Sequence, residues 1–227
     1  MNAEEIRARI DSAMTRAGRN DKVYFAAVSK TRTVEEMREA EKISWVDYFG
    51  ENRVQEAESK RKLYGQSRVL WRLIGHLQAN KARKALDIFD TIDSVDSEEL
   101  AQRLNRIAGE LGKIVPVLIE VNTSGEASKS GVSPENFTRL LDVVAAQENL
   151  RLDGLMTVGP ITDSERDIRS SFSQLRTLSE NARVRTGLDL LVLSMGMSGD
   201  FELAILEGST LIRIGTLLFG PRDYSQH

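Results

Sequence analysis

The chain has 227 residues, of which 41% are hydrophobic, and its 31 Lys and Arg nearly balance its 34 Asp and Glu. This is enough for one sizeable core, and the net charge of -3 argues against non-specific nucleic-acid binding. The lack of cysteine excludes disulfides, thiolate metal sites and thiol nucleophiles. The sequence opens without the apolar core of a signal peptide, and no apolar run reaches the about 18 residues of a membrane span, so we expect a cytoplasmic protein.

A charged, periodic segment at 2–17 predicts a first helix, which Asn2 can cap and Gly18 ends. After it, short apolar runs alternate with helical segments. The apolar runs predict eight strands, at 23–29, 45–50, 69–75, 89–95, 115–122, 151–159, 188–196 and 210–215. Helices are expected at 34–43 behind a capping box of Thr33 and Glu36, at 52–64, in a segment ending near 86, at 97–111, behind Ser133-Pro134, at 164–185 and at 200–207.

Strict alternation of strands and helices implies a parallel sheet, and strands that are apolar on both faces are typical of such a sheet. Eight units favour a single (β/α)8 TIM-type barrel with an extra N-terminal helix, and a doubly wound open sheet is the alternative fold. No Pro/Gly/Ser-rich linker interrupts the sequence. We therefore expect residues 1–227 to form one domain.

In a barrel the functional groups lie at the C-terminal ends of the strands and in the loops that follow. The first strand ends in Ser29-Lys30-Thr31, where partial desolvation would free the Lys30 amine to act as a nucleophile. A solvated lysine at a strand end is the alternative. Asn52 follows the second strand, where it can face the barrel mouth or, as a lone Asn more often does, cap the next helix.

The histidine content argues against two common kinds of hydrolytic site. There are only two histidines, His76 after the third strand and His227 at the last position. Zinc catalysis needs about three His, Cys or carboxylate ligands, and no cluster supplies them. No nucleophile elbow accompanies His76, so a Ser-His-Asp triad is also a poor interpretation.

Two loops with phosphate-binding character follow the last two strands. The first contains Ser194, Met195, Met197 and Ser198 among glycines, and the second is Arg213-Ile214-Gly215-Thr216. Loops after strands seven and eight form the recurring phosphate site of these barrels, because glycines expose backbone N–H groups and Ser and Thr add donors. Either loop alone is also compatible with an ordinary tight turn.

The closed barrel would make the first and eighth strands neighbours, so that Lys30 faces these loops. A ligand with an aldehyde at one end and a phosphate at the other fits such a site. Pyridoxal 5′-phosphate is one such ligand. The rival is a sugar-phosphate intermediate of an aldolase.

Long sequence blocks, in order, cover about residues 23 to 222 and resemble the pyridoxal phosphate homeostasis protein family, which is similar to the N-terminal barrel of alanine racemase. The blocks are AVSKT (27–31), FGEN-VQE (49–56), IGHLQANK (74–81), VN-S-E-SKSG (121–131), GLMTVGP (154–160), LSMGMSGDFELAI (193–205) and GST-IRIGT-LFG (208–220). The resemblance implies that Lys30 forms a Schiff base with the cofactor and that Arg213 binds the pyridine nitrogen. It further implies a phosphate cradle of Ser194, Ser198, Gly215 and Thr216, a place near the ring for Asn52, and a cavity lined by Met195 and Met197.

One position departs from the family pattern: the block before IGHLQ usually contains Trp-His, and here it is Trp71-Arg72. Whether this matters depends on which way the Arg72 side chain points. If it lined the mouth of the site, the charge and ligand preference of the site would change.

The resemblance leaves open whether the chain is an enzyme or a carrier. An arginine at the pyridine nitrogen weakens the electron sink of the cofactor. Racemisation needs an acid–base group on each face, and alanine racemase supplies the second from a C-terminal domain, for which Tyr224 is a poor substitute. We therefore expect a monomeric carrier or buffer of pyridoxal phosphate. Weak racemase-like activity and an interaction module with a vestigial site are the alternatives.

A carrier would have apoenzymes that depend on pyridoxal phosphate as its recipients. Lys129 lies in the Gly/Ser-rich loop after the fifth strand. As a mobile lysine at the rim, it is a candidate for accepting the cofactor during transfer. A solvated loop lysine is the ordinary alternative.

Overall fold

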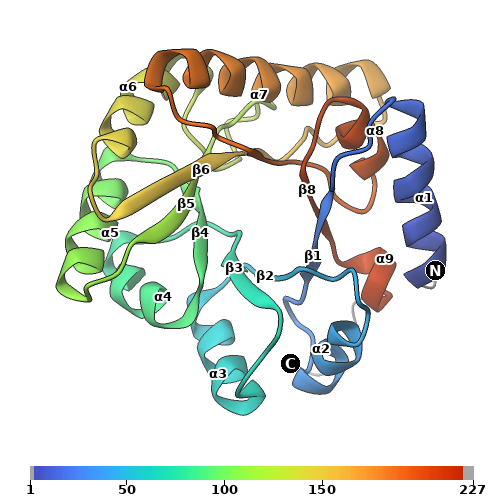
Figure 1. Ribbon diagram of the computed structural model, residues 1–227, viewed down its shortest axis with the longest axis horizontal. Coiled ribbons are helices and arrows are strands. Elements are labelled where there is room, and N and C mark those ends of the chain that lie inside the picture. Colours follow the sequence, from blue (N-terminus) through green and yellow to red (C-terminus); the bar gives the residue numbers. More distant parts are fainter. Residues whose placement is uncertain (1–2, 222–227) are drawn as a thin grey trace.

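The computed structural model describes residues 3–221, and its strands form one closed parallel barrel in chain order (Figure 1). The strands are β1 (Tyr24–Val28), β2 (Tyr48–Glu51), β3 (Leu70–Leu73), β4 (Thr91–Val95), β5 (Val115–Glu120), β6 (Leu150–Met156), β7 (Val192–Ser194) and β8 (Leu211–Ile214). Strand β8 pairs in parallel with β1 and closes the ring. The predicted (β/α)8 barrel is confirmed, and the open doubly wound sheet is wrong.

Helices surround the barrel on its outer side (Figure 1). In chain order they are α2 (Val34–Glu41), α3 (Val54–Tyr64), the 3-10 turn η1 (Ala79–Lys81) with α4 (Ala82–Ile88), α5 (Glu98–Glu110), α6 (Pro134–Ala145), α7 (Glu165–Thr186), α8 (Phe201–Leu206) and α9 (Thr216–Phe219). The extra helix α1 (Ala3–Arg16) precedes the first strand, as predicted, and lies beside α8, to which Arg9 is joined by an ion pair with Glu202 at 2.7 Å. The predicted cap Asn2 lies outside the described residues.

Local signals explain where several helices begin. Thr33 and Glu36 form the predicted capping box, with each side chain bonded to the other residue's backbone N–H. Pro134 occupies the first turn of α6, as expected for a residue without an N–H. The prediction that Asn52 caps α3 is wrong, because the N-cap is Arg53, which makes no side-chain capping bond. The turn after β2 is therefore one residue longer than the capping pattern suggested.

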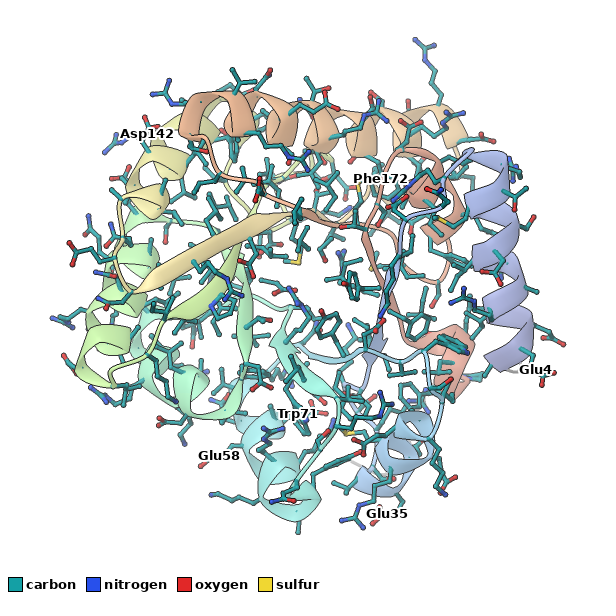
Figure 2. The ribbon with its side chains drawn as sticks, in the orientation of Figure 1. Glu4, Glu35, Glu58, Trp71, Asp142 and Phe172 are labelled. Atoms are coloured by element: carbon teal, nitrogen blue, oxygen red, sulfur yellow. The ribbon has the colours of Figure 1, made fainter. Side chains whose placement is uncertain are left out.

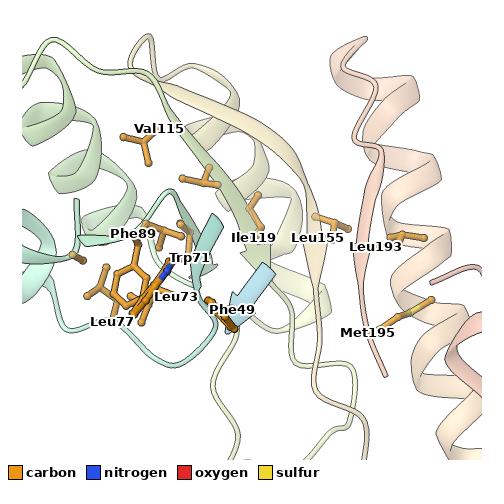
Figure 3. Close-up of a cluster of buried hydrophobic side chains, with 14 of the residues drawn as sticks. Phe49, Trp71, Leu73, Leu77, Phe89, Val115, Ile119, Leu155, Leu193 and Met195 are labelled. Atoms are coloured by element: carbon orange, nitrogen blue, oxygen red, sulfur yellow. The ribbon is translucent and has the colours of Figure 1, made fainter. Parts of the chain in front are cut away.

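The hydrophobic core lies between the barrel and its helices, where aliphatic and aromatic side chains interlock (Figures 2 and 3). Phe49, Tyr64 and Trp71 form an edge-to-face cluster with ring centroids 5.6–5.9 Å apart. Phe49 and Trp71 come from neighbouring strands and Tyr64 from the end of α3, so this cluster fixes the helix against the sheet. Burying an aromatic side chain of this size contributes about 2–3 kcal/mol to stability.

A glycine sets the spacing between β6 and β7. A Cβ atom on Gly154 would lie 1.9 Å from the carbonyl oxygen of Val192. Only a residue without a side chain permits so close an approach of the two backbones. Within residues 3–221 no helix is long and apolar enough to cross a membrane.

Candidate functional site

A pocket of about 200 Å³ opens at the C-terminal ends of β1 and β8. It is lined by Val28, Lys30, Arg32, Met197, Ser198, Gly199, Arg213, Gly215 and Thr216. The barrel thus joins the lysine after the first strand to both predicted phosphate loops. This is the end of the barrel at which functional groups are expected.

The segment that carries Lys30 turns sharply at the end of β1. Ser29 is fully buried, Lys30 is half-buried, and Thr31 adopts a left-handed conformation with φ of 64°. Behind this segment, the Lys60 ammonium of α3 pairs with Glu51 of β2 at 2.8 Å and with Glu56 of α3 at 2.6 Å. Three charged side chains therefore lie close to the backbone on either side of Lys30.

Arg213 forms the floor of the pocket and is only 3% exposed. Its guanidinium donates from Nη1 to the hydroxyl oxygen of Ser194 and from Nη2 to the carbonyl oxygen of Thr157, both at 2.8 Å. Burial lowers the pKa of Arg213, and the carboxylates of Asp93, Asp200 and Glu120 oppose this shift. The two hydrogen bonds fix the plane of the guanidinium at the base of the site.

The loop between β7 and α8 forms one wall of the pocket. Gly196 has φ of 97°, and a Cβ there would lie 2.6 Å from the Ala204 Cβ, so this turn requires glycine. The backbone N–H of Met197 donates to the Asp200 carboxylate, which holds the loop over the start of α8. Burial raises the pKa of Asp200, and the bond from Met197 opposes that shift.

Three predicted residues lie outside the pocket lining. The Ser194 hydroxyl is fully buried beneath the site and accepts from Arg213, so it supports the arginine. Met195 is fully buried in the core between barrel and helices, and of the two methionines Met197 is the one in the pocket wall (Figure 3). Asn52 is half-buried in the turn after β2, with its backbone packed against Gly75.

Arg72 points away from this pocket. It lines a larger cavity, of about 470 Å³, at the opposite end of the barrel, together with Tyr24 and Tyr48 at the starts of β1 and β2. Its guanidinium forms a two-point ion pair with Asp93, Nε to Oδ2 at 2.8 Å and Nη2 to Oδ1 at 2.9 Å. The departure from the family pattern at this position therefore leaves the composition of the C-terminal pocket unchanged.

Glu120 is a buried acid that the sequence analysis did not select. It ends β5 and is 5% exposed, and its Oε2 atom has no hydrogen-bond partner among the described residues. Burial, reinforced by the charge of Asp96, raises its pKa to about 7, although Arg213 opposes the shift. A glutamate that closes an otherwise apolar strand was the signal available in the sequence.

Lys129 is held in place at the rim, which corrects the expectation of a mobile side chain. Its ammonium donates to Glu126 at 2.9 Å and to the carbonyl oxygen of Gly159. Only 13% of its side chain is exposed. Over residues 3–221 no group of three His, Cys, Asp or Glu residues is arranged to hold a metal ion.

Comparison with known proteins places the chain in a family. Residues 1–223 match the family model "Alanine racemase, N-terminal domain". The pyridoxal phosphate homeostasis proteins of Vibrio cholerae and Pseudomonas aeruginosa are 41% and 42% identical to the chain, over 100% and 98% of its length and 97% and 95% of theirs. The chain belongs to the pyridoxal phosphate homeostasis protein family.

Solved structures agree with this family assignment. PipY of Synechococcus elongatus, solved with PLP bound, is 38% identical with a TM-score of 0.81, covering 94% of this chain and 99% of that one. Alanine racemase of Clostridium difficile is 17% identical with a TM-score of 0.73, covering 100% of this chain and 58% of that one. The racemase is thus similar in fold, and the family's chains have about the length of this one.

Proposed function

We propose that the chain binds pyridoxal 5′-phosphate in the C-terminal pocket, as a Schiff base on Lys30, and acts as a carrier or buffer of the cofactor. The observation that carries the proposal is the meeting of Lys30 with both predicted phosphate loops and the buried Arg213 in one pocket. The PLP-bound PipY structure and the names of the relatives support the choice of cofactor.

The pocket residues suit the three parts of such a ligand. The neutral Lys30 amine would add to the aldehyde carbon, and one water molecule would leave as the Schiff base forms. Ser198, Gly215 and Thr216 offer hydroxyl and backbone N–H donors to a phosphate. Arg213 offers a fixed donor to the pyridine nitrogen.

We propose further that the chain has no robust catalytic activity. Among the residues that line the pocket, Lys30 is the one with a side-chain amine, and the others are arginines, hydroxyl residues, glycines and apolar residues. Racemisation needs a second such group on the opposite face of the ring, and the candidate Tyr224 lies outside the described residues. We also propose that the protein is a cytoplasmic monomer that delivers the cofactor to apoenzymes. The name of its relatives, pyridoxal phosphate homeostasis protein, supports a role in handling the cofactor.

The absorbance spectrum tests the Schiff base. Adding pyridoxal phosphate to the purified protein should produce a visible band that borohydride removes, and Lys30→Ala should abolish the band. The matched control is Lys62→Ala, which removes an exposed lysine on α3 that pairs with Glu58, and it should keep the band. A band of equal strength in Lys30→Ala, or none in the unaltered protein, would contradict the proposal.

Racemisation assays test the second part. Amino acids should keep their configuration, apart from trace turnover, when incubated with the loaded protein. Racemisation well above trace rates that disappears in Lys30→Ala would instead support the racemase-like alternative.

A further inference from the structure

The same group of charged side chains holds the residues on both sides of Lys30. Lys60 donates to the carbonyl oxygen of Ser29 at 2.6 Å, and Glu51 accepts from the Ser29 hydroxyl at 2.7 Å. On the other side, the backbone N–H of Thr31 donates to Glu56 at 2.6 Å. Residues 29 and 31 are thus both fixed, which leaves the Cα–Cβ direction of the residue between them little freedom.

The backbone conformation of Thr31 shows that these contacts do more than fill space. Among the described residues, Thr31 and Leu190 are the only ones other than glycine with positive φ. A left-handed conformation costs a non-glycine residue about 1–2 kcal/mol, so other contacts must hold it. The charged oxygen of Glu56 supplies such a contact, because a hydrogen bond to an ionised acceptor is about twice as strong as a neutral one.

The burial of these charges is hard to explain by stability alone. Glu51 is 0% exposed and Lys60 is 8% exposed. The cost of removing two charges from water often offsets their mutual attraction, so a buried ion pair adds little net stability. What the pair does contribute is a fixed geometry, and here that geometry lies directly behind Lys30.

We propose that Glu51, Glu56 and Lys60 form a positioning clamp, which sets the direction of Lys30 toward the pocket. The purpose of the clamp rests on the proposed Schiff base, whereas its hold on the Ser29–Thr31 turn stands by itself. Lys60 ties the two carboxylates together and anchors Ser29. Glu56 holds Thr31 in its left-handed conformation.

Glu56→Ala is the variant that tests the clamp. Glu56 is on a helix and partly exposed, so its loss threatens folding less than the loss of the fully buried Glu51. The matched control is Glu58→Ala on the same helix (Figure 2). This variant breaks surface ion pairs to Lys62 and Lys84. Urea unfolding of both variants identifies any loss of fold.

Two measurements on these variants test whether the clamp positions Lys30. The first is hydrogen exchange of the Thr31 amide without cofactor, which we expect to be at least tenfold faster in Glu56→Ala than in the unaltered protein or Glu58→Ala. The second is the rate of Schiff-base formation with pyridoxal phosphate, which we expect to fall about tenfold in Glu56→Ala alone. Glu56→Gln, whose neutral amide oxygen can still accept from Thr31 but cannot pair with the Lys60 charge, should fall between Glu56→Ala and the unaltered protein in both measurements.

Unchanged Thr31 exchange in Glu56→Ala would overturn the clamp, and so would altered exchange with an unaltered rate of Schiff-base formation. Failure of the proposed function would give a different result from failure of the clamp. In that case the unaltered protein itself forms no Schiff base, while the exchange of Thr31 still shows whether Glu56 holds the turn.

Discussion

Replacing Arg72 with methionine should lower the free energy of unfolding by about 3–5 kcal/mol. Arg72 is 5% exposed, and its partner Asp93 is completely buried. Methionine fills similar space but cannot donate hydrogen bonds, so among the described residues Asp93 would keep the hydroxyl of Thr91 as its one hydrogen-bond donor. A buried carboxylate that loses its cation must either remain charged in an apolar setting or take up a proton, and both are costly.

Urea unfolding at neutral pH measures this loss, with Arg151→Met as the matched control. Arg151 also pairs with an aspartate, Asp153, at 2.6 Å, but 62% of its side chain is exposed. Breaking such a pair should cost less than about 1 kcal/mol. Equal losses in the two variants would show that burial does not control the strength of these pairs.

The same variant also tests the assignment of the functional end of the barrel. Arg72 lines the cavity at the N-terminal end and is not part of the C-terminal pocket. Folded Arg72→Met protein should therefore take up pyridoxal phosphate as the unaltered protein does. A large change in uptake would indicate that pyridoxal phosphate binds in the N-terminal cavity, which Arg72 lines.

The barrel could be predicted from the sequence because its signal is repeated along the whole chain. Eight apolar runs separated by helical segments allow few arrangements. Apolar runs overestimate the length of a strand where apolar residues continue into the neighbouring loop. The run 188–196 contains only three strand residues, Val192–Ser194, because Leu188 and Leu191 belong to the loop that lines the N-terminal cavity.

The positions of the strand ends also explain which of the predicted residues the structure brings into the pocket. Lys30, Ser198 and Thr216 follow strand ends, and the closed barrel brings them together whatever the details of register. Ser194 and Met195 are different, because they lie where β7 ends, and successive side chains in a strand point to opposite faces. One therefore lies under Arg213 inside the barrel, and the other is in the outer core.

Side-chain contacts between different helices and strands could not be predicted from the sequence. The Lys60 ammonium meets the Ser29 carbonyl across 31 positions, and Arg72 meets Asp93 across 21. These contacts depend on the register of neighbouring strands and on the rotation of a helix about its axis, neither of which composition or periodicity specifies. The supporting contacts of the site, unlike its main residues, therefore required the structure.

Glu120→Gln should remove part of the pH dependence of stability. The folded-state pKa of Glu120 is about 7, compared with about 4.3 for a glutamate in an unfolded chain. Between these values the folded protein binds more protons than the unfolded one, so the contribution of Glu120 to stability falls as pH rises from about 4 through 7. Glutamine cannot ionise, and its amide occupies nearly the same volume.

The substitution Glu120→Gln changes the free energy of unfolding relative to the unaltered protein. This change should be about 2–3 kcal/mol more favourable at pH 8 than at pH 4. Urea unfolding at both pH values measures the difference. Glu99→Gln, at an exposed position on α5, should show no such gain. A gain that is the same at both pH values would mean that Glu120 does not keep its proton into the neutral range. The positive charge of Arg213 would then outweigh the burial of the carboxyl, and three ionised acids, Asp93, Glu120 and Asp200, would share the interior of the barrel with two arginines, Arg72 and Arg213.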